Sequence, residues 1–214
     1  YYAHTMIIDL LLRQNIDIHA QDTFGDTPLH IATRRGFTYI VATLLANDAC
    51  PDIKNALEDT PLYIATYHGY QDIIYTLLHY DADINTQNNR HKCETVLHQA
   101  GENKDQYIMA LLLRYNPIID SRDIYGETPL FKVLDTPEHT HMLLAYQANP
   151  NARNLSKQAP IHWATAYRNH AVLHLLFTYG AYPNVQDTRG RTPLHIATHF
   201  RYISTVQYLT KHNA

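Results

Sequence analysis

Histidine is the residue type whose abundance first suggests chemistry in this chain. There are 15 histidines, and an imidazole can act as a general base or a metal ligand near neutral pH. The densest group is Glu138, His139 and His141, but its two histidines lack the i, i+4 helical spacing that brings two imidazoles to one zinc ion. A metal-ligand role for this group is therefore not favoured.

Other residue patterns that would indicate an enzyme are missing from the sequence. It has no nucleophile elbow, no phosphate-cradling glycine loop and no paired carboxylates at a recognisable catalytic spacing. Its two cysteines, Cys50 and Cys93, form no CxxC pair, which argues against a zinc site or a disulfide scaffold and favours a reducing compartment. We predict a non-catalytic chain with no cofactor and no metal.

Charge is distributed unevenly and suggests a binding role for the C-terminal end. Residues 151–214 contain 7 Lys/Arg and a single acidic residue, Asp187, whereas residues 1–150 contain 10 Lys/Arg and 19 Asp/Glu. The two parts therefore carry about +6 and −9. The split predicts an anionic partner for the basic end, although drift along the chain would give the same pattern. The total charge of −3 does not favour nucleic-acid binding.

The elements that position these residues follow from a recurring segment, Thr27 to Ala32, with the sequence Thr-Pro-Leu-His-Ile-Ala. Versions of it begin at Thr60, Thr95, Thr128, Ala159 and Thr192, with spacings of 33, 35, 33, 31 and 33 residues. Threonine can cap a helix and proline suits its first position, so each copy predicts a helix start. The histidines at the fourth position (His30, His98, His162 and His195) thus have a regular, structural spacing.

A second, amphipathic helix is predicted in each repeat, as in Ile40–Leu45, Ile73–Leu78 and Val172–Leu176. It ends at a residue suited to a left-handed backbone, usually Asn or Asp. The series is Asn15, Asp48, Asp81, Asn116, Gln147, Gly180 and Asn213. Residues 5–14 match this second helix, so we expect residues 1–20 to be a partial repeat.

These repeats resemble those of the ankyrin-repeat family. Residues 22–32 and 187–197 are near-complete copies of its motif. The resemblance implies an all-α solenoid of stacked antiparallel helix pairs with β-hairpin fingers, as a single array over residues 1–214. In such units the repeated histidine is expected to hydrogen-bond the backbone of a neighbouring finger. Neither end resembles a terminal cap, so we expect further repeats beyond both.

Departures from the motif predict local irregularity. The finger around Asn88 to Lys92 is about two residues longer, and the connector from Asp135 to Glu138 is about two shorter and contains Pro137. Glycine is replaced at three finger turns and three helix connectors, so we expect strained or reshaped turns there. These positions are Glu58, Cys93, Lys157, Lys104, Arg168 and Arg201. Trp163 aligns with isoleucines of other repeats and is predicted to be a core residue.

The resemblance also implies a partner-binding face formed by finger tips and the C-terminal ends of the first helices. Aromatic residues and arginine are prominent at these positions, as in interface hot spots. The predicted contact residues are Phe24, Arg34, Arg35, Leu57, Tyr67, His68, Tyr125, Tyr167, Arg168, Arg189, Arg191, His199, Phe200 and Arg201; Glu102 and Asn103 are also helix-end positions. Alternatively, Phe24, Leu57 and Tyr125 pack against neighbouring fingers.

We therefore predict an intracellular, cytoplasmic, monomeric scaffold that binds another protein. The basic C-terminal end is predicted to bind an acidic or phosphorylated segment of that partner. One alternative is a targeting or regulatory segment of a larger enzyme or channel, and another is head-to-tail self-association. The sequence contains no run of 18 apolar residues, so it predicts no membrane span. The Tyr-, Asn-, Ile- and His-rich composition with 7 Gly suits an AT-rich genome, including those of intracellular bacteria and large DNA viruses whose ankyrin-like proteins act in the host cytosol.

Overall fold

The computed structural model describes residues 17–90 and 92–213. They belong to two compact units that divide between Asn103 and Lys104, and each unit is described by itself. The helix expected over residues 5–14 lies outside the described residues. In the part that is described, no helix has the length and apolar character needed to cross a membrane. A single array over residues 1–214 remains a prediction.

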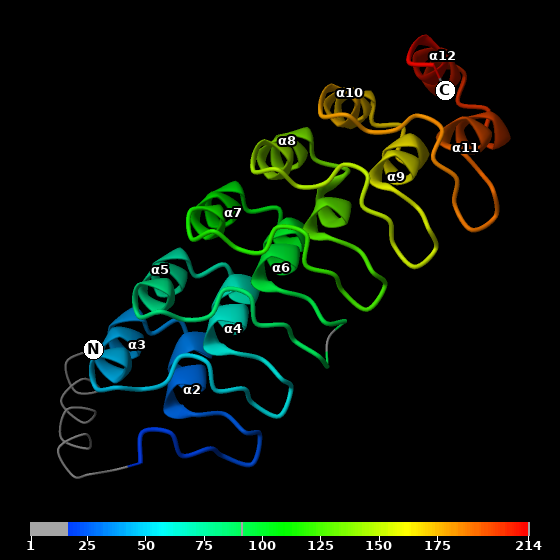
Figure 1. The fold of residues 1–214 in the computed structure, drawn as a ribbon. Coiled ribbons are helices and arrows are strands. Elements are labelled where there is room, and N and C mark those ends of the chain that lie inside the picture. The colour runs from blue at the N-terminus through cyan, green and yellow to red at the C-terminus, as the bar shows by residue number, and fades with distance from the viewer. Residues whose placement is uncertain (1–16, 91, 214) are drawn as a thin grey trace. The chain divides into compact units, whose positions relative to one another are not determined.

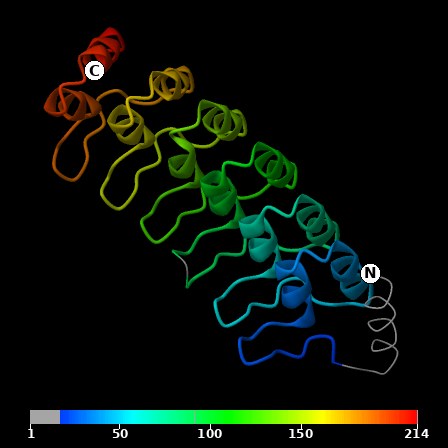
Figure 2. The ribbon, with the colours of Figure 1, turned by 180° about the vertical axis from the view of Figure 1, so that it is seen from behind.

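The first unit consists of helix pairs stacked side by side. Its first helices are α2 (Pro28–Arg34), α4 (Pro61–His68) and α6 (Val96–Asn103), and its second helices are α3 (Thr38–Ala46) and α5 (Gln71–His79). The first helices form one row and the second helices another, and long loops project from the first row (Figures 1 and 2). Leu62, Ile74 and Leu77 are fully buried where the pairs meet, so burial between neighbouring pairs holds this unit together.

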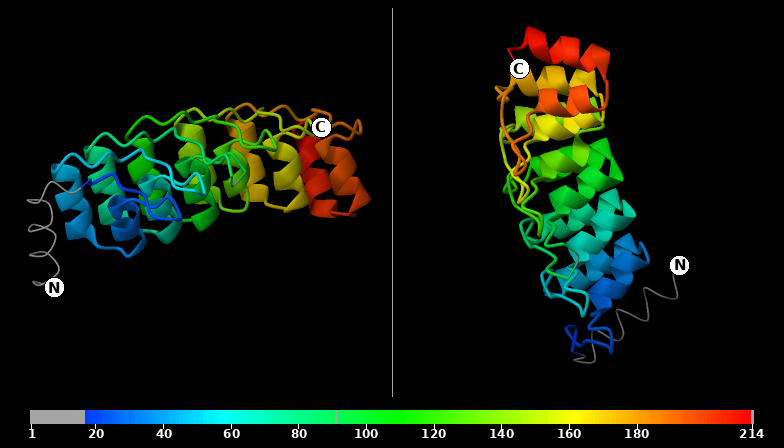
Figure 3. Two further views of the ribbon diagram at one scale, coloured as in Figure 1. Left: turned by 90° about the horizontal axis from the view of Figure 1, so that it is seen from below. Right: turned by 90° about the vertical axis from the view of Figure 1, so that its right-hand side faces the viewer.

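The second unit repeats this arrangement with α7 (Gln106–Leu113), η1 (Pro129–Val133), α8 (Pro137–Ala145), α9 (Pro160–Ala166), α10 (His170–Thr178), α11 (Pro193–His199) and α12 (Ile203–Lys211). Its long loops also project from its first helices (Figure 1) and lie along one side of its helices (Figure 3). Leu112, Val133, Leu143 and Leu173 are fully buried. The predicted fold class, stacked helix pairs with projecting fingers, is confirmed.

The helix starts predicted at Thr27, Thr60 and Thr192 are confirmed by side-chain capping bonds, whereas the helices that follow Thr128 and Ala159 begin without one. The Thr27 side chain accepts a hydrogen bond from His30 N, and Thr192 does the same for His195 N. The imidazole Nδ1 of His30 in turn accepts from Thr27 N at 3.1 Å. Two N–H groups at the helix start are thereby satisfied, which is the geometry of a capping box.

One first helix differs from the α-helix expected at Thr128. Residues Pro129–Val133 form a 3-10 helix because the following connector is short. Pro137 begins α8 and restricts Thr136 to an extended backbone (φ −120°, ψ 104°). Thr136 N therefore bonds back to Val133 O at 2.9 Å, which ends the first helix early.

The predicted left-handed turns are also confirmed. Lys104, Arg168 and Arg201, which replace glycine between helices, have φ values of 55°, 56° and 57°. Glu58, Cys93 and Lys157 at finger turns have φ values of 64°, 55° and 55°. A residue with a Cβ is strained in this region, so these turns store conformational energy that glycine would release.

Replacing Lys157 by glycine is expected to raise the free energy of unfolding by roughly 0.5–1 kcal/mol, because the strain exceeds the added entropy of the unfolded chain. Lys157→Ala is the matched control, since it removes the same side chain but keeps the Cβ. Urea titrations of the two variants measure the difference. Equal stability of the glycine and alanine variants would show that the turn is not strained.

Candidate functional site

The fingers are closed by an aspartate or asparagine whose side chain accepts backbone N–H groups of the tip. In the first finger, Asp22 Oδ1 accepts from Phe24 N at 2.8 Å and Asp26 N at 2.9 Å. Gly25 follows with φ 72°, and a Cβ there would lie 2.6 Å from Ala56 N of the next finger. Asn55, Asp123 and Asp187 accept equivalent pairs of bonds, and Asn154 Oδ1 accepts the N–H of Gln158. The fingers are therefore hairpin-shaped loops with ordered tips.

Neighbouring fingers are tied by long polar side chains at one repeat position. Gln21 Nε2 donates to Lys54 O at 3.0 Å, and Lys54 Nζ donates to Gln87 O at 2.8 Å. In the second unit, Arg122 donates to Arg153 O at 2.6 Å, and Arg153 donates to Gln186 O at 2.5 Å. These bonds hold successive tips at a fixed spacing within each unit, so side chains on the tips are presented on a preorganised surface.

The repeated histidines tie a first helix to the next finger, as expected. His30 Nε2 lies 3.1 Å from Asp59 O, and His162 Nε2 lies 3.1 Å from Arg191 O. Burial lowers the pKa of both imidazoles, although these backbone hydrogen bonds partly oppose the shift. Neutral, buried and hydrogen-bonded imidazoles are structural, which accounts for two of the most regular histidines.

The finger tips and helix ends expose large side chains. Phe24 is 71% exposed, Tyr67 is 61% exposed and Phe200 is 54% exposed. Tyr125 and Tyr167 are each half exposed, and Leu57 is also exposed. Exposed aromatic side chains on ordered loops are typical of protein interfaces. Arg35, at the C-cap of α2, is exposed as well.

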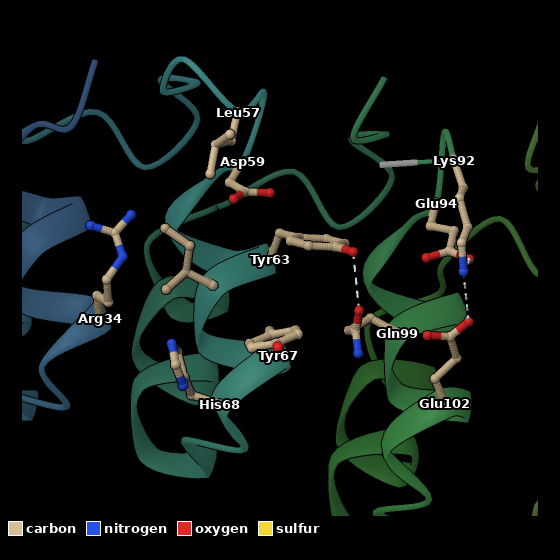
Figure 4. Close-up of a pocket in the computed structure, with 11 residues that line it drawn as sticks. Arg34, Leu57, Asp59, Tyr63, Tyr67, His68, Lys92, Glu94, Gln99 and Glu102 are labelled. Carbon is tan, nitrogen blue, oxygen red and sulfur yellow. Dashed lines mark hydrogen bonds and ion pairs between the residues drawn. The ribbon is translucent and has the colours of Figure 1, made fainter. Parts of the chain in front are cut away.

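Four predicted residues, Arg34, Leu57, Tyr67 and His68, line one pocket of about 400 Å³ in the first unit. Figure 4 shows it between the end of α2, the helix α4 and the helix α6. Its floor consists of buried side chains and its rim of exposed ones. The prediction missed six lining residues: Asp59, Tyr63, Ile64, Lys92, Glu94 and Gln99.

Tyr63 shapes this pocket because it stands where four of the other repeats have histidine (His30, His98, His162 and His195). Instead of reaching the next finger, its hydroxyl donates to Gln99 Oε1 of α6 at 3.0 Å. Gln99 Nε2 donates to Asn103 Oδ1 at 2.8 Å, and Asn103 Nδ2 returns to Thr66 O at 2.7 Å. The chain of bonds fixes Tyr63 on the pocket floor. The change from histidine to tyrosine in the repeated segment was the sequence signal for it.

The predicted basic residues of the second unit have different roles. Arg191 donates through Nε to Asp187 Oδ2 at 2.8 Å, and its Nη2 is 2.7 Å from the same oxygen. The Arg168 guanidinium lies over the Tyr202 ring, 4.9 Å from its centroid. Phe200 stacks on Tyr202 and makes an edge contact with His199. Arg189 and Arg201 are exposed. Arg191 thus stabilises its own finger, whereas Arg168 packs against the aromatic ring of Tyr202.

Trp163 and His139 were also considered in the sequence, as a core residue and as a metal ligand. Trp163, expected in the core, is half-buried; it contacts the rings of Phe131 and Tyr167, and its Nε1 donates to Gln158 Oε1 at 3.2 Å. A partly exposed site suits this tryptophan because its N–H needs a polar partner. His139 is buried within α8, and no group of three or more potential metal ligands is found among the described residues.

Comparisons with known proteins agree with this geometry. The ankyrin repeats (3 copies) family model matches residues 1–88 and 132–214. An ankyrin repeat protein of Fowlpox virus (strain NVSL) is 31% identical over 138 residues, which are 64% of this chain and 20% of that protein. The chain therefore spans about a fifth of this relative's length.

Two solved structures share the fold. The ankyrin repeat domain of Bcl-3, from the IkappaB protein family, has a TM-score of 0.83 at 24% identity and covers 94% of this chain and 91% of its own. The human ASB11 ankyrin repeat domain has a TM-score of 0.75 at 23% identity, covering 89% and 86%. The family match over most of the sequence is decisive for classification: the chain belongs to the ankyrin-repeat family, whose repeats are generally protein–protein interaction modules.

Proposed function

We propose that this chain is a non-catalytic scaffold that binds a partner protein through its finger tips and first-helix ends. One observation carries the proposal: large side chains are exposed at these positions. Phe24 and Tyr125 lie on fingers fixed by their own hydrogen bonds, and Tyr67 lies at the end of α4. Burying them in a partner would release water from apolar surface at little conformational cost. The free thiols of Cys50 and Cys93 are consistent with action inside a cell.

Selection of peptide ligands with the whole chain, followed by affinity measurements on purified variants, tests the proposal. Tyr125→Ala is expected to weaken a ligand that binds the second unit at least about tenfold, as for an aromatic hot spot. Tyr146→Ala is the control, because Tyr146 is 45% exposed at the C-cap of α8. The proposal is wrong if the selected ligands lose affinity with Tyr146→Ala and not with variants of the fingers.

The basic surface of the second unit is proposed to bind an acidic or phosphorylated segment of the partner. Arg189→Glu is expected to weaken binding of an acidic peptide roughly three- to tenfold at low salt, and less at high salt. Lys211→Glu, at an exposed position of α12, is the control with the same charge change. Unchanged affinity of Arg189→Glu at low ionic strength would reject this assignment. Arg191 is left intact because its reversal would repel buried Asp187.

A second candidate is that the array positions or regulates a longer protein. It is favoured by the Fowlpox virus relative, of which this chain spans 20%. A viral origin would extend the proposal to a host-directed role in the cytosol. The complete reading frame tests it: a catalytic or membrane-spanning segment encoded with the array would support it, and a reading frame of ankyrin repeats alone would reject it.

A further inference from the structure

The pocket of the first unit has an excess of negative charge. Three carboxylates, Asp59, Glu94 and Glu102, line it together with the cations Arg34 and Lys92. Arg34 is ion-paired with Asp26, which does not line the pocket; its Nη2 donates to Asp26 Oδ1 at 3.0 Å. Arg34 is thus shared with a carboxylate outside the pocket, while Lys92 lies beside the lining carboxylates Glu94 and Glu102. Residues 1–103 also contain 13 Asp/Glu and 6 Lys/Arg, so the whole unit favours a cationic ligand.

The pocket already holds an ammonium group, but loosely. Lys92 Nζ lies 3.9 Å from Glu94 Oε1 and 3.7 Å from Glu102 Oε1, and the Lys92 side chain is 47% exposed. The pair with Glu102 is long and solvent-exposed on both sides, and such a pair contributes little to stability. Lys92 thus marks a cation position that a better-fitting group could occupy.

Two aromatic rings complete the pocket. Tyr63 and Tyr67 lie one turn apart on α4 and project between Arg34 on one side and Glu94 and Glu102 on the other (Figure 4). Tyr63 is held by Gln99. Burial raises its pKa, and the charges of Glu94, Asp59 and Glu102 raise it further. The negative field that disfavours a tyrosinate would favour a cation at the same place.

We propose that this pocket binds an arginine side chain of the partner protein, with the guanidinium stacked on Tyr67 and paired with Glu102 in place of Lys92. A guanidinium combines a planar face for an aromatic ring with a fork of donors for a carboxylate, and it is less strongly hydrated than an ammonium. The inference rests on the proposed scaffold function and names the chemistry that one of its sites recognises.

The test is an NMR titration of the whole chain, labelled on its tyrosine rings, with N-acetyl-arginine methylamide. The Tyr67 ring signal, assigned with Tyr67→Phe, is expected to shift saturably with a dissociation constant in the millimolar range, as for a small fragment. The blocked citrulline analogue, which is nearly isosteric and neutral, is expected to give no saturable shift. The blocked lysine analogue is expected to bind several-fold more weakly than arginine.

Variants separate recognition from folding. Glu102→Gln and Tyr67→Ala, both at exposed positions, are expected to weaken arginine binding at least about fivefold. Because Tyr67→Ala lacks the Tyr67 ring, binding to this variant is measured from the signals of the other tyrosine rings in the pocket. Asp81→Asn and Tyr75→Ala are matched controls on exposed positions of the same unit away from the pocket, and both should bind as the wild type does. Lys92→Ala removes the competing ammonium and should strengthen binding, which a structural role would not predict.

Citrulline binding equal to arginine binding, or unchanged arginine affinity in Glu102→Gln, would overturn the inference. If arginine fails to bind while selected ligands still depend on Tyr125, the pocket assignment is wrong and the scaffold function stands. If selected ligands do not depend on the finger residues, the scaffold function itself fails, whatever the arginine result.

Discussion

Replacing Asp123 by alanine is expected to lower the free energy of unfolding by about 3–5 kcal/mol, because it removes one partner of a buried ion pair. Asp123 Oδ2 lies 3.1 Å from Lys132 Nζ, and the two side chains are 0% and 11% exposed. Asp123 Oδ1 also accepts the N–H groups of Tyr125 and Glu127 at 2.9 Å each. The substitution would thus destabilise the finger tip and also remove the nearer carboxylate from the poorly solvated Lys132 ammonium, whose Nζ lies 3.9 Å from Glu127 Oε2.

Repeat comparison supplies the control for this prediction. Asn55 and Ile64 occupy the positions of Asp123 and Lys132 in an earlier repeat, where Asn55 still accepts the tip N–H groups. Asp123→Asn alone should be destabilising, and the double variant D123N/K132I should recover most of the loss. Urea unfolding followed by circular dichroism measures each. A double variant no more stable than D123N would contradict the ion-pair account.

Acidification is expected to destabilise the chain in two steps, beginning with the buried histidines. Burial lowers the pKa of His30 and His162 below the ordinary value of 6.5, so protons bind more tightly to the unfolded chain. The contribution of the two neutral imidazoles to the free energy of unfolding is complete above pH 6.5. It is lost as the pH falls through their lower pKa values in the folded chain. Burial raises the pKa of Asp26, but hydrogen bonds from Arg34 and Asn55 outweigh it, so the net pKa falls below 3.8. Its contribution is lost only in stronger acid.

The double variant H30Q/H162Q isolates the histidine step. It should lose roughly 1–3 kcal/mol per site at pH 7, because each imidazole bond to a finger carbonyl is broken. Its free energy of unfolding should change less between pH 7 and pH 5 than that of the wild type. His174→Gln, at an exposed position of α10, should retain the wild-type slope. An unchanged slope in H30Q/H162Q would show that these histidines do not set the pH dependence.

Features governed by local backbone chemistry could be predicted from the sequence. Threonine and proline set the start of α2 and α11, and the left-handed turns at Lys104 and Arg168 followed from their alignment with glycine. The 3-10 conformation of Pro129–Val133 was less predictable, since it depends on how the short connector before Pro137 constrains the backbone at the end of this helix. An irregularity was expected there, but not its form.

Features that depend on contacts between repeats could not be predicted in the same way. The Tyr63 hydroxyl bonds to Gln99, 36 residues later, so the pocket that it shapes is visible only when α4 and α6 are packed. Similarly, the sequence predicted Arg191 as a partner-binding residue, but the structure shows its guanidinium on Asp187 of the same finger. Its role toward a partner remains a prediction, and Arg189 is the better residue for testing it.

The central claim is that partners bind the fingers and first-helix ends and not the second helices. Hydrogen–deuterium exchange of the whole chain, with and without a selected peptide ligand, tests this most directly. We expect slower exchange in fingers such as residues 22–26 and 123–127 and at first-helix ends such as Tyr67 and His68, with little change in α3, α5, α8 and α10. Protection confined to those second helices, with unchanged exchange in every finger, would contradict the account.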